Sequence, residues 1–573
     1  MKVSDYIAAF LSAQNIHFVY EVAGGMITHL LDALYRQGEI RLISCHHEQA
    51  AAFAADAMAR LTGRPGIAMA TSGPGATNLL TGIGTCYFDS SPAIFITGQV
   101  NTYEQKGSKP LRQQGFQETD IVSIARSITK ASWRVEAPGQ VPGLLEKAYR
   151  LSLSGRPGPV LIDIPMDVQR SEMDCPMPAK LSAPAMKSPD KKLMNELFQD
   201  LSQARRPLIL AGGGIQAARA GQQFRDFVEK INIPVVHSLM AVDALPYAHP
   251  LRVGMIGTYG NRWANKSISM SDFLLVVGSR LDIRQTGADV EAFRAGKVIY
   301  HVDCDEGEIN NRVTGCRSVL THLKPFLALA AEMSAQYRMP DSGVWLNDIG
   351  KLRQSWPDVA ELKGLSGINP NEFMHALSRA SNAASAFVLD IGQHQMWGAQ
   401  SLEINSGQRL LTSGGMASMG FALPASIGAS LSSPDRPVVL IAGDGGFQFN
   451  IQELETIVHN KLPVKIVVIN NECYGMVRQF QESYFEKRYQ STYWGYSAPD
   501  FTKIARAYGI ESLTVSKTED LSSALEQMWR DAGQPFLLQV MIDPLVNTYP
   551  KIAFGLPLTE MEPFAKPIEM EGT

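Results

Sequence analysis

The stretch from residue 438 to residue 471 constrains the fold more than any other part of this chain. It reads VVLIAGDGGFQFNIQELETIVHNKLPVKIVVINN, with an apolar run at each end and a helical pattern between them. A strand, a crossover helix and a second strand form a βαβ unit, whose two strands are parallel neighbours. Because the carboxyl ends of such strands lie side by side, Asp444 and Asn471 are expected to point into one crevice.

The residues at these strand ends predict a site for a metal-bound diphosphate. Asp444 and Asn471 offer hard oxygen ligands that suit Mg²⁺ or Ca²⁺, and the glycines let backbone N–H groups approach a phosphate closely. Asn450 is expected to cap the intervening helix, with Glu453 completing a capping box. The alternative is a structural turn in which Asp444 only caps a helix. The 24 residues that separate GDG from NN make the pattern more specific than a lone GDG.

The composition is that of an ordinary soluble globular protein, with 573 residues of which 45% are hydrophobic and 19% charged. At roughly 150 residues per domain, this length predicts three or four domains. The net charge of −4 gives no support for nucleic acid or an anionic membrane as partner, and no apolar run reaches the roughly 18 residues that span a bilayer. The first residues fit an amphipathic helix better than a signal peptide. The six cysteines include no CxxC pair, which favours reduced thiols in a cytoplasmic protein.

Apolar strands and helical patterns alternate along the chain, which predicts an α/β fold of three doubly wound parallel-sheet domains. Two segments rich in proline and polar residues, 171–192 and 334–370, interrupt the alternation and are expected to be linkers. The second has helix-like patches around Trp345 and Trp356. The expected divisions are 1–170, 190–335 and 365–545, followed by an irregular tail, 546–573.

A second group of polar residues lies in the first division. Glu48 opens a long alanine-rich helix, where helix propensity is high. Taken alone, it is best read as a carboxylate that favours the helix macrodipole. Its context changes that reading, because TSGPGATN (71–78) forms a turn suited to a ligand-facing loop and GFQETD (115–120) follows in a polar stretch. Glu48 is therefore a candidate for a catalytic role.

Several motifs, in the same order along essentially the whole chain, resemble acetohydroxyacid synthase, a flavin-containing branch of the thiamin diphosphate (ThDP) enzymes. The motifs are HEQAAAFAADAMARLTGRPGIAMATSGPGATN, GFQETD, GQHQMWGAQ, TSGGMASMGFALPASIGA, GDG…NN and YGMVRQFQ. The resemblance implies that the three domains bind, in chain order, the pyrimidine of ThDP, FAD, and the diphosphate with Mg²⁺. It also implies a homodimer or homotetramer with ThDP at the subunit interface.

The resemblance assigns roles to matching positions. Glu48 would hydrogen-bond the aminopyrimidine ring of ThDP and promote removal of its C2 proton, and Gln117 would face the reacting carbon. Met419 would prop the cofactor in its bent shape, and the carbonyl of Ala417 would accept from its amino group. The Mg²⁺ ligands would be Asp444, Asn471 and the carbonyl of Cys473. The other ThDP-binding positions would be Gly24, Gly25, Pro74, Asn78, Gly392, Gln393, His394, Gly445, Gly446 and Met476.

The middle division resembles the flavin-binding domain of that branch through GGG (212–214), SLM (238–240), GSRLDIR (278–284) and HVDCD (301–305). AGGG by itself is weak evidence, because it lacks the full GxGxxG spacing. FAD is expected to be largely structural, since net carboligation transfers no electrons. The FAD positions would be Gly213, Gly214, Ser238, Leu239, Met240, Gly257, Gly278, Arg280, Asp282, Arg284 and Asp303.

Positions along the substrate channel depart from the family. Val22 and Ala23 stand where the family has Tyr and Pro, Met166 where it has Lys, and Phe480 where it has Trp. The loop KGSKPLRQQ, directly before GFQE, also differs. Loss of the lysine weakens recognition of an anionic acceptor, and phenylalanine leaves more room than tryptophan. Arg284 is retained and could still hold a carboxylate.

These departures favour a carboligase that decarboxylates pyruvate and transfers the two-carbon unit to an aldehyde, ketone or keto-sugar. Carboligases that build branched-chain sugars such as yersiniose are similar. The first alternative is the catalytic subunit of a biosynthetic acetohydroxyacid (acetolactate) synthase. A flavin-dependent pyruvate oxidase and a catalytically silent homologue are further alternatives, and retention of Glu48, Asp444 and Asn471 argues against the last.

Overall fold

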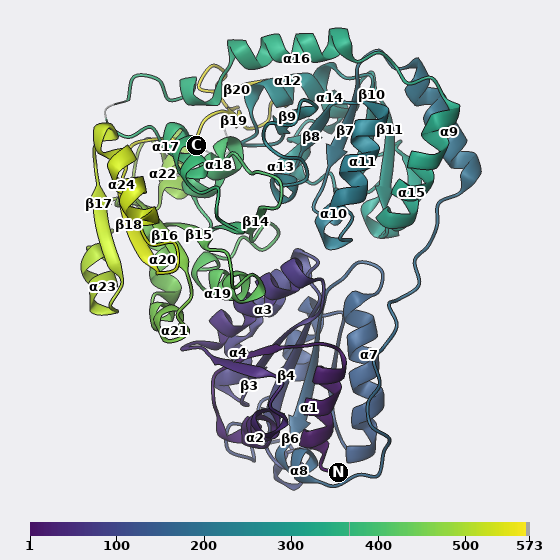
Figure 1. Ribbon diagram of the computed structural model, residues 1–573, viewed down its shortest axis with the longest axis vertical. Coiled ribbons are helices and arrows are strands. Elements are labelled where there is room, and N and C mark those ends of the chain that lie inside the picture. The colour runs from purple at the N-terminus through teal and green to yellow at the C-terminus, as the bar shows by residue number, and fades with distance from the viewer. Residues whose placement is uncertain (366, 569–573) are drawn as a thin grey trace.

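The computed structural model describes residues 1–365 and 367–568. It contains three parallel sheets of six strands each, with helices packed against them (Figure 1). This confirms the predicted α/β class with three doubly wound sheets. In Figure 1 the first sheet lies in the lower part of the molecule, and the second and third lie side by side above it. Most strand residues are buried on both faces, which explains their near-continuous apolar sequences.

The first sheet has the order β2-β1-β3-β4-β6-β5. Its strands are β1 (Phe18–Glu21), β2 (Arg41–Ser44), β3 (Gly66–Ala70), β4 (Ala93–Gln99), β5 (Ala131–Arg134) and β6 (Pro159–Pro165). The accompanying helices are α1 (Val3–Ala13), α2 (Thr28–Gln37), α3 (Glu48–Thr62), α4 (Pro74–Asn78), α5 (Leu80–Phe88), α6 (Ile121–Ala125), α7 (Val141–Leu153) and α8 (Met166–Arg170). The expected N-terminal amphipathic helix is α1, which buries Val3, Ile7 and Leu11.

The third sheet has the order β14-β13-β15-β16-β18-β17. Its strands are β13 (Ala386–Leu389), β14 (Arg409–Thr412), β15 (Val438–Gly443), β16 (Val464–Asn470), β17 (Glu511–Val515) and β18 (Phe536–Met541). Its helices are α17 (Pro370–Ala380), α18 (Gln393–Ser401), α19 (Ala422–Ser432), α20 (Asp444–Phe447), α21 (Glu453–His459), α22 (Gly475–Tyr484), α23 (Phe501–Ala507) and α24 (Leu521–Trp529). Numbered from its own first strand, this sheet repeats the order of the first sheet, so the two share one topology without an evident sequence repeat.

The middle sheet differs, with the order β12-β11-β10-β7-β8-β9. Renumbered from its first strand, this is 3-2-1-4-5-6 read from the far edge, the order of a dinucleotide-binding fold. Its strands are β7 (Pro207–Ala211), β8 (Val235–His237), β9 (Arg252–Met255), β10 (Phe273–Val277), β11 (Val298–Asp303) and β12 (Arg317–Leu320). Its helices are α9 (Lys191–Gln203), α10 (Gly214–Ala217), α11 (Gly221–Ile231), α12 (Arg262–Met270), α13 (Ile283–Thr286), α14 (Val290–Arg294), α15 (Leu323–Met333) and α16 (Gly343–Ser355).

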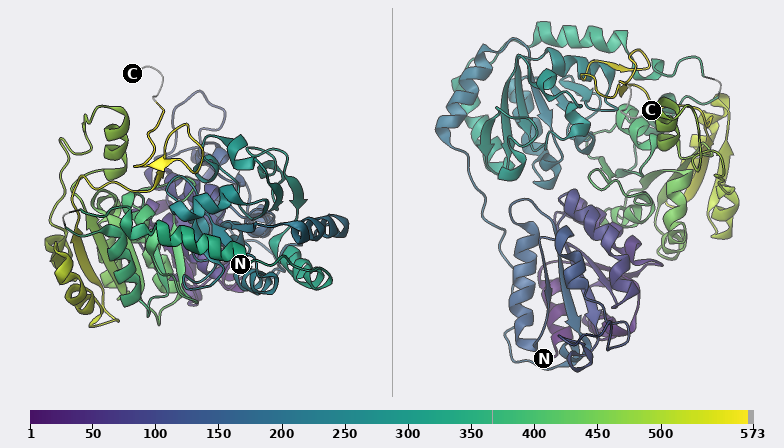
Figure 2. Two further views of the ribbon diagram at one scale, coloured as in Figure 1. Left: turned by 90° about the horizontal axis from the view of Figure 1, so that it is seen from above. Right: turned by 180° about the vertical axis from the view of Figure 1, so that it is seen from behind.

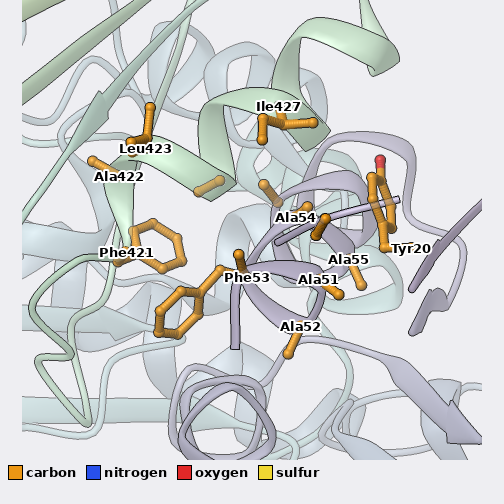
Figure 3. Close-up of a cluster of buried hydrophobic side chains, with 14 of the residues drawn as sticks. Tyr20, Ala51, Ala52, Phe53, Ala54, Ala55, Phe421, Ala422, Leu423 and Ile427 are labelled. Carbon is orange, nitrogen blue, oxygen red and sulfur yellow. The ribbon is translucent and has the colours of Figure 1, made fainter. Parts of the chain in front are cut away.

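Helices α3 and α19 join the first and third sheets into one hydrophobic core (Figure 3). The rings of Phe53 and Phe421 meet edge to face, with their centroids 5.4 Å apart. Small residues let the two backbones approach closely, and a methyl group at Gly428 would overlap the carbonyl oxygen of Ala54. The contact places the start of α3 and the segment before α19 in one region of the molecule.

The segment 171–190 contains no helix and no multi-residue strand, as expected of a linker. Figure 2 shows it running along the outside of the molecule toward α9. The second expected linker contains α16, at the helix-like pattern around Trp345. This helix packs on the middle sheet, where Trp345 is buried and donates to the carbonyl of Pro207 at 3.2 Å. The tail is mostly irregular but contains a small antiparallel pair, β19 (Lys551–Ile552) and β20 (Met561–Glu562).

The predicted capping box is also wrong. Helix α21 begins at Glu453, and the Asn450 side chain instead donates to the carbonyl of Gly420 at 2.8 Å and to Gln49 at 3.1 Å. The Glu453 carboxylate accepts from the backbone N–H of His46 at 2.9 Å. Both side chains therefore hold the first and third sheets together, a tertiary use that the local pattern does not reveal. Across the described ranges, no helix is both long and apolar enough to cross a membrane.

Candidate cofactor site

Asp444 and Asn471 follow adjacent parallel strands, as the sequence predicts. Strands β15 and β16 pair with Gly443 opposite Ile469, so both strands end at the same edge of the sheet. Asp444 is buried, and burial raises its pKa to about 7. Its Oδ2 accepts a hydrogen bond from the hydroxyl of Tyr496 at 3.0 Å. A carboxylate kept out of water in this way is stabilised by a nearby cation.

Three oxygen-bearing groups converge at this point. The Asn471 amide nitrogen donates to Gln393 at 3.1 Å, so its other end lies 3.2 Å from Asp444 Oδ1 and 2.9 Å from the carbonyl of Cys473. With the amide oxygen turned toward them, the Asp444 carboxylate and the Cys473 carbonyl would share a hard cation with Asn471. A half-turn of the amide would let nitrogen donate to both oxygens instead. The donor set of carboxylate, amide and carbonyl fits Mg²⁺.

Glycines surround the carboxylate. A Cβ at Gly446 would lie 2.5 Å from Asp390 Oδ1, and one at Gly445 would overlap the ring of Tyr474. A cavity of about 530 Å³ opens beside Gly445, and among its lining residues are Gln448, Phe449, Tyr474, Trp494 and Tyr496. Gly392 has φ of 154°, and a side chain there would collide with His394. Glycine at these positions therefore lets the turn pack closely against Asp390, Tyr474 and His394.

His394 is a buried neutral acceptor rather than a charged ligand for phosphate. Its Nε2 accepts from the backbone N–H of Gly443 at 3.2 Å, and burial lowers its pKa to about 3. Gln393 donates to the carbonyl of Val546 at 2.9 Å. Both side chains thus hold backbone close to Asp444 in place.

Asp390 was missed by the sequence analysis. It accepts from the backbone N–H groups of Gly420 at 3.0 Å and Ala422 at 2.9 Å, and burial raises its pKa to about 6. Asp390 thereby anchors the end of the segment that contains Ala417, at φ of 54°, and half-buried Met419. The available signal was an acidic residue directly after an apolar strand, two residues before Gly392.

The first sheet holds the other end of the same segment. The Asp89 carboxylate accepts from the N–H groups of Gly414 at 3.1 Å and Gly415 at 2.7 Å, and it pairs with Arg60 at 2.9 Å. The hydroxyls of Thr85 and Ser418 lie 2.8 Å apart. Segment 414–420 is therefore fixed from two sheets.

Glu48 begins α3 as predicted and is only 8% exposed. Its Oε2 accepts from Asn78 at 2.9 Å, and Gly75 leaves the space next to Oε1 open, since a Cβ there would lie 3.2 Å away. Gln117, at φ of 64°, packs against Gly73, whose added Cβ would lie 3.0 Å from that of Gln117. The turn 71–78 thus contacts both residues predicted to be catalytic.

Other predicted positions of the first sheet lie around the same turn. Gly24 packs on Thr71, whose hydroxyl accepts from the N–H of Met26 at 3.2 Å. Gly25 has open space where a Cβ would be, and Pro74 begins α4. Within residues 1–365 and 367–568, no hydrogen bond joins the Glu48 group to the Asp444 group.

The predicted flavin positions lie at the point where the middle sheet reverses its strand order. Strands β7 and β10 are adjacent there, and the N–H of Gly214 donates to the carbonyl of Gly278 at 2.9 Å. A Cβ at Gly214 would lie 2.8 Å from Gly278, so only glycines allow this approach. In open α/β sheets, ligands bind outside the carboxyl ends of strands at such a reversal. Gly213, Gly214 and Gly278 lie at this reversal.

The predicted flavin positions close to this reversal contact different parts of the chain. Ser238, Leu239 and Met240 follow β8, and a Cβ at Gly414 would overlap the Met240 sulfur, so this segment contacts the third sheet. Gly257, at φ of 111°, packs on the carbonyl of Arg284.

The charged residues predicted for FAD also have local structural contacts. Asp282 caps α13 by accepting from the N–H groups of Arg284 at 2.9 Å and Gln285 at 3.3 Å, and it lies 3.4 Å from Arg280. Asp303 ends β11, and burial raises its pKa to about 6. A cavity of about 730 Å³ also lies on this part of the chain, but no predicted site residue lines it.

The predicted channel residues come from different parts of the chain. Val22 follows β1 and Met166 opens α8, both at strand ends of the first sheet. Phe480 lies on α22 of the third sheet, is 39% exposed and has its ring centroid 4.7 Å from that of Tyr484. Met476 is half-buried on the same helix.

The three sheets and the glycine-lined turn with Asp444 define a class of protein, the thiamine pyrophosphate enzymes. Residues 1–124 match the N-terminal TPP-binding domain of these enzymes, 194–329 their central domain and 390–540 their C-terminal TPP-binding domain. The chain therefore requires ThDP for its activity.

Similar proteins narrow the class. The acetolactate synthase large subunit of Lactococcus lactis is 34% identical, over 97% of this chain and 95% of that protein. The isozyme 2 large subunit of Escherichia coli is 34% identical, over 98% and 99%, and the probable large subunit of Methanocaldococcus jannaschii is 34% identical, over 100% and 96%. The chain belongs to the acetolactate synthase large-subunit family and is a ThDP-dependent enzyme of that type.

Proposed function

We propose that the chain is a ThDP- and Mg²⁺-dependent carboligase that decarboxylates pyruvate and joins the two-carbon unit to an aldehyde, ketone or keto-sugar. The observation that carries the cofactor half of this proposal is the convergence of oxygens from Asp444, Asn471 and Cys473. Mg²⁺ among them would hold the diphosphate, and the cavity beside Gly445 would take it. Bound ThDP supplies the electron sink that lets pyruvate lose CO₂.

The remaining residues bind, orient and move protons. Buried Glu48 would accept a hydrogen bond from the aminopyrimidine ring, and Asn78 holds its carboxylate in place. Gln117 would orient the reacting carbonyl from the loop next to Gly73. Segment 414–420 would support the cofactor through Ala417 and Met419, and its two anchored ends fix that support in advance.

The site would be completed by a second copy of the chain. One chain presents the Glu48 and Asp444 groups without a hydrogen bond between them, which supports a homodimer or homotetramer with the cofactor between subunits. Mixing Glu48→Gln with Asp444→Asn variants tests this arrangement. A hybrid dimer would regain one intact site, so an equal mixture should recover about a quarter of wild-type activity. No recovery after confirmed subunit exchange would place both groups in one chain.

FAD would be bound by the middle sheet in a structural role. The support is the close glycine contact between Gly214 and Gly278 at the strand-order reversal, where ligands of open α/β sheets bind. Flavin absorbance that co-purifies with the chain, and stays oxidised during turnover with pyruvate, is the expected result. Flavin reduction by pyruvate with oxygen consumption would favour a pyruvate oxidase instead.

The acceptor proposal rests on Val22, Met166 and Phe480, which give the channel less charge and more room than the family pattern. The test is product identification from pyruvate with a panel of aldehydes, ketones and keto-sugars. New carbon–carbon bonds to such acceptors are expected. Acetolactate as the sole efficient product would refute the proposal.

The second candidate is then a biosynthetic acetolactate synthase. Retained Arg284, which is exposed and close to Gly257, favours it because a guanidinium could bind the carboxylate of a second 2-keto acid. An Arg284→Ala variant that loses acetolactate formation but keeps transfer to ketones would separate the two candidates.

A further inference from the structure

A basic loop, residues 106–112, precedes Gln117 and has no role in the chemistry above. It reads KGSKPLR, with three cations and no acidic residue. Glu118 closes the loop by accepting from the backbone N–H groups of Lys106 at 2.8 Å, Gln114 at 2.9 Å and Gly115 at 3.2 Å. Gly115 is buried, and a Cβ there would lie 2.9 Å from Val100. The loop is therefore built around fixed hydrogen bonds.

The three cations have no carboxylate partner among the described residues. Lys106 Nζ donates to the carbonyl of Leu111 at 3.1 Å, and Lys109 Nζ to the Gln114 side chain at 2.7 Å. Arg112 is exposed and makes no side-chain hydrogen bond or ion pair within the described ranges. The carboxylate oxygens of Glu118, the nearest acidic residue in sequence, accept hydrogen bonds from backbone N–H groups instead. A guanidinium with five unpaired donors is suited to a bidentate anion.

The basic loop is close to the reacting groups. Gln117 packs against Gly73, and the same turn carries Asn78, which holds Glu48. Five residues of extended chain reach at most about 18 Å, so the Cα atom of Arg112 lies within that distance of the Cα atom of Gln117. Met166, in contrast, removes a positive charge from the channel position where the family pattern has lysine.

We infer that the basic loop binds a phosphate group of the acceptor, held away from the carbonyl that reacts. This rests on the proposed carboligase function and deepens it, because it specifies a phosphorylated ketone or keto-sugar. The absence of charge at Met166 suits a neutral carbonyl, and Lys109 and Arg112 supply the charge for the distal anion. Arginine is well suited to this task because its planar fork matches phosphate oxygens.

The experiment compares matched acceptors with and without phosphate at two spacings. The pairs are dihydroxyacetone with its phosphate, and fructose with fructose 6-phosphate, each supplied with pyruvate to the holoenzyme. The phosphorylated member of at least one pair is expected to have a kcat/KM about tenfold higher or more, through a lower KM. Arg112→Ala and Lys109→Ala should each remove most of this preference, and Arg112→Lys should keep part of it.

A control and a binding measurement separate this inference from the proposed function. Lys191→Ala removes an exposed lysine on α9 and should leave the preference unchanged. Direct titration with fructose 6-phosphate, fructose and inorganic phosphate needs no turnover. Tighter binding of the sugar phosphate than of the other two, lost in Arg112→Ala, is expected.

Three results would overturn the inference regardless of which products form. They are equal binding of fructose and fructose 6-phosphate, equally tight binding of inorganic phosphate, and binding that Arg112→Ala does not weaken. A change of oligomeric state in Arg112→Ala would also overturn it, by making the loop a subunit contact. Acetolactate as sole product would refute the proposed function, while the titration would still decide whether the loop holds phosphate.

Discussion

The contact between α3 and α19 predicts opposite effects for the same substitution at two helical glycines. In Gly428→Ala, the new methyl group would overlap the carbonyl oxygen of Ala54 and would have to retreat by about 1.3 Å to reach ordinary van der Waals contact. The obstacle is backbone, so no side-chain rotation can relieve it. Gly143, exposed on α7, has no atom within 4 Å of an added Cβ. Only the first substitution forces two packed helices apart.

The expected magnitudes follow from these contacts. Overpacking costs about 1–3 kcal/mol, and a backbone obstacle places Gly428→Ala near the upper end. Alanine regains about 1 kcal/mol of helix propensity, so the net loss is about 2 kcal/mol. At roughly 2–4 °C per kcal/mol, the melting temperature should fall by about 4–8 °C. Gly143→Ala brings only the gain in helix propensity, so its melting temperature should rise by about 2–4 °C.

The assay is thermal unfolding of both variants and wild type at one scan rate, with pyruvate-dependent CO₂ release measured in parallel. Because α3 begins at Glu48 and α19 follows segment 414–420, Gly428→Ala should also weaken ThDP activation, and Gly143→Ala should not. Equal or higher melting temperatures for both variants would refute the packing argument. A fall in both would show that alanine is unfavourable in these helices for another reason.

Three further predictions concern single side chains. Glu48→Gln should keep the wild-type melting temperature and lose about 100-fold or more of CO₂ release, because its carboxylate assists proton transfer; turnover within tenfold of wild type would remove it from the mechanism. Asp444→Asn should raise the Mg²⁺ concentration for half-activation by about tenfold or more, since it removes the anionic ligand; an unchanged curve would contradict the metal site. Burial alone would lower the pKa of His375, but Asp358 and Glu403, each 2.9 Å from one ring nitrogen, raise it above 6.5. The stabilisation from this histidine is therefore fully present below about pH 6.5 and lost as pH rises through the folded-state pKa. The melting-temperature deficit of His375→Gln should be larger at pH 6 than at pH 9, and an equal deficit would show that the imidazolium charge contributes nothing.

Hydrophobic runs and helix propensity predicted those helices and strands whose formation depends mainly on residues close in sequence. The apolar runs around GDG and NN became adjacent parallel strands because each is long enough to be buried on both faces. Glu48 begins α3 because the alanines after it favour a helix. The capping role of Asn450 failed because Gly420, thirty residues earlier in the chain, competes for its amide. Asp390 was missed for the same reason, since its partners come from a segment that only the folded sheet brings near.

The shared topology of the first and third sheets explains how the two halves of the candidate site are placed. Helix α3 connects the second and third strands of the first sheet, and α19 connects the second and third strands of the last one. The two helices therefore occupy equivalent positions in their sheets. Their packing resembles an isologous interface, in which the same surface of two subunits meets across a two-fold axis. Glu48 begins one of these helices, and segment 414–420 leads into the other. Asp444 likewise follows β15, the counterpart of β3, which leads into the turn 71–78. Glu48 thus follows the second strand of the first sheet, and Asp444 follows the third strand of the last sheet. A second copy, approaching so that its third sheet faces the first sheet of its partner, would bring the groups together twice. That is the arrangement which the mixed-variant experiment tests.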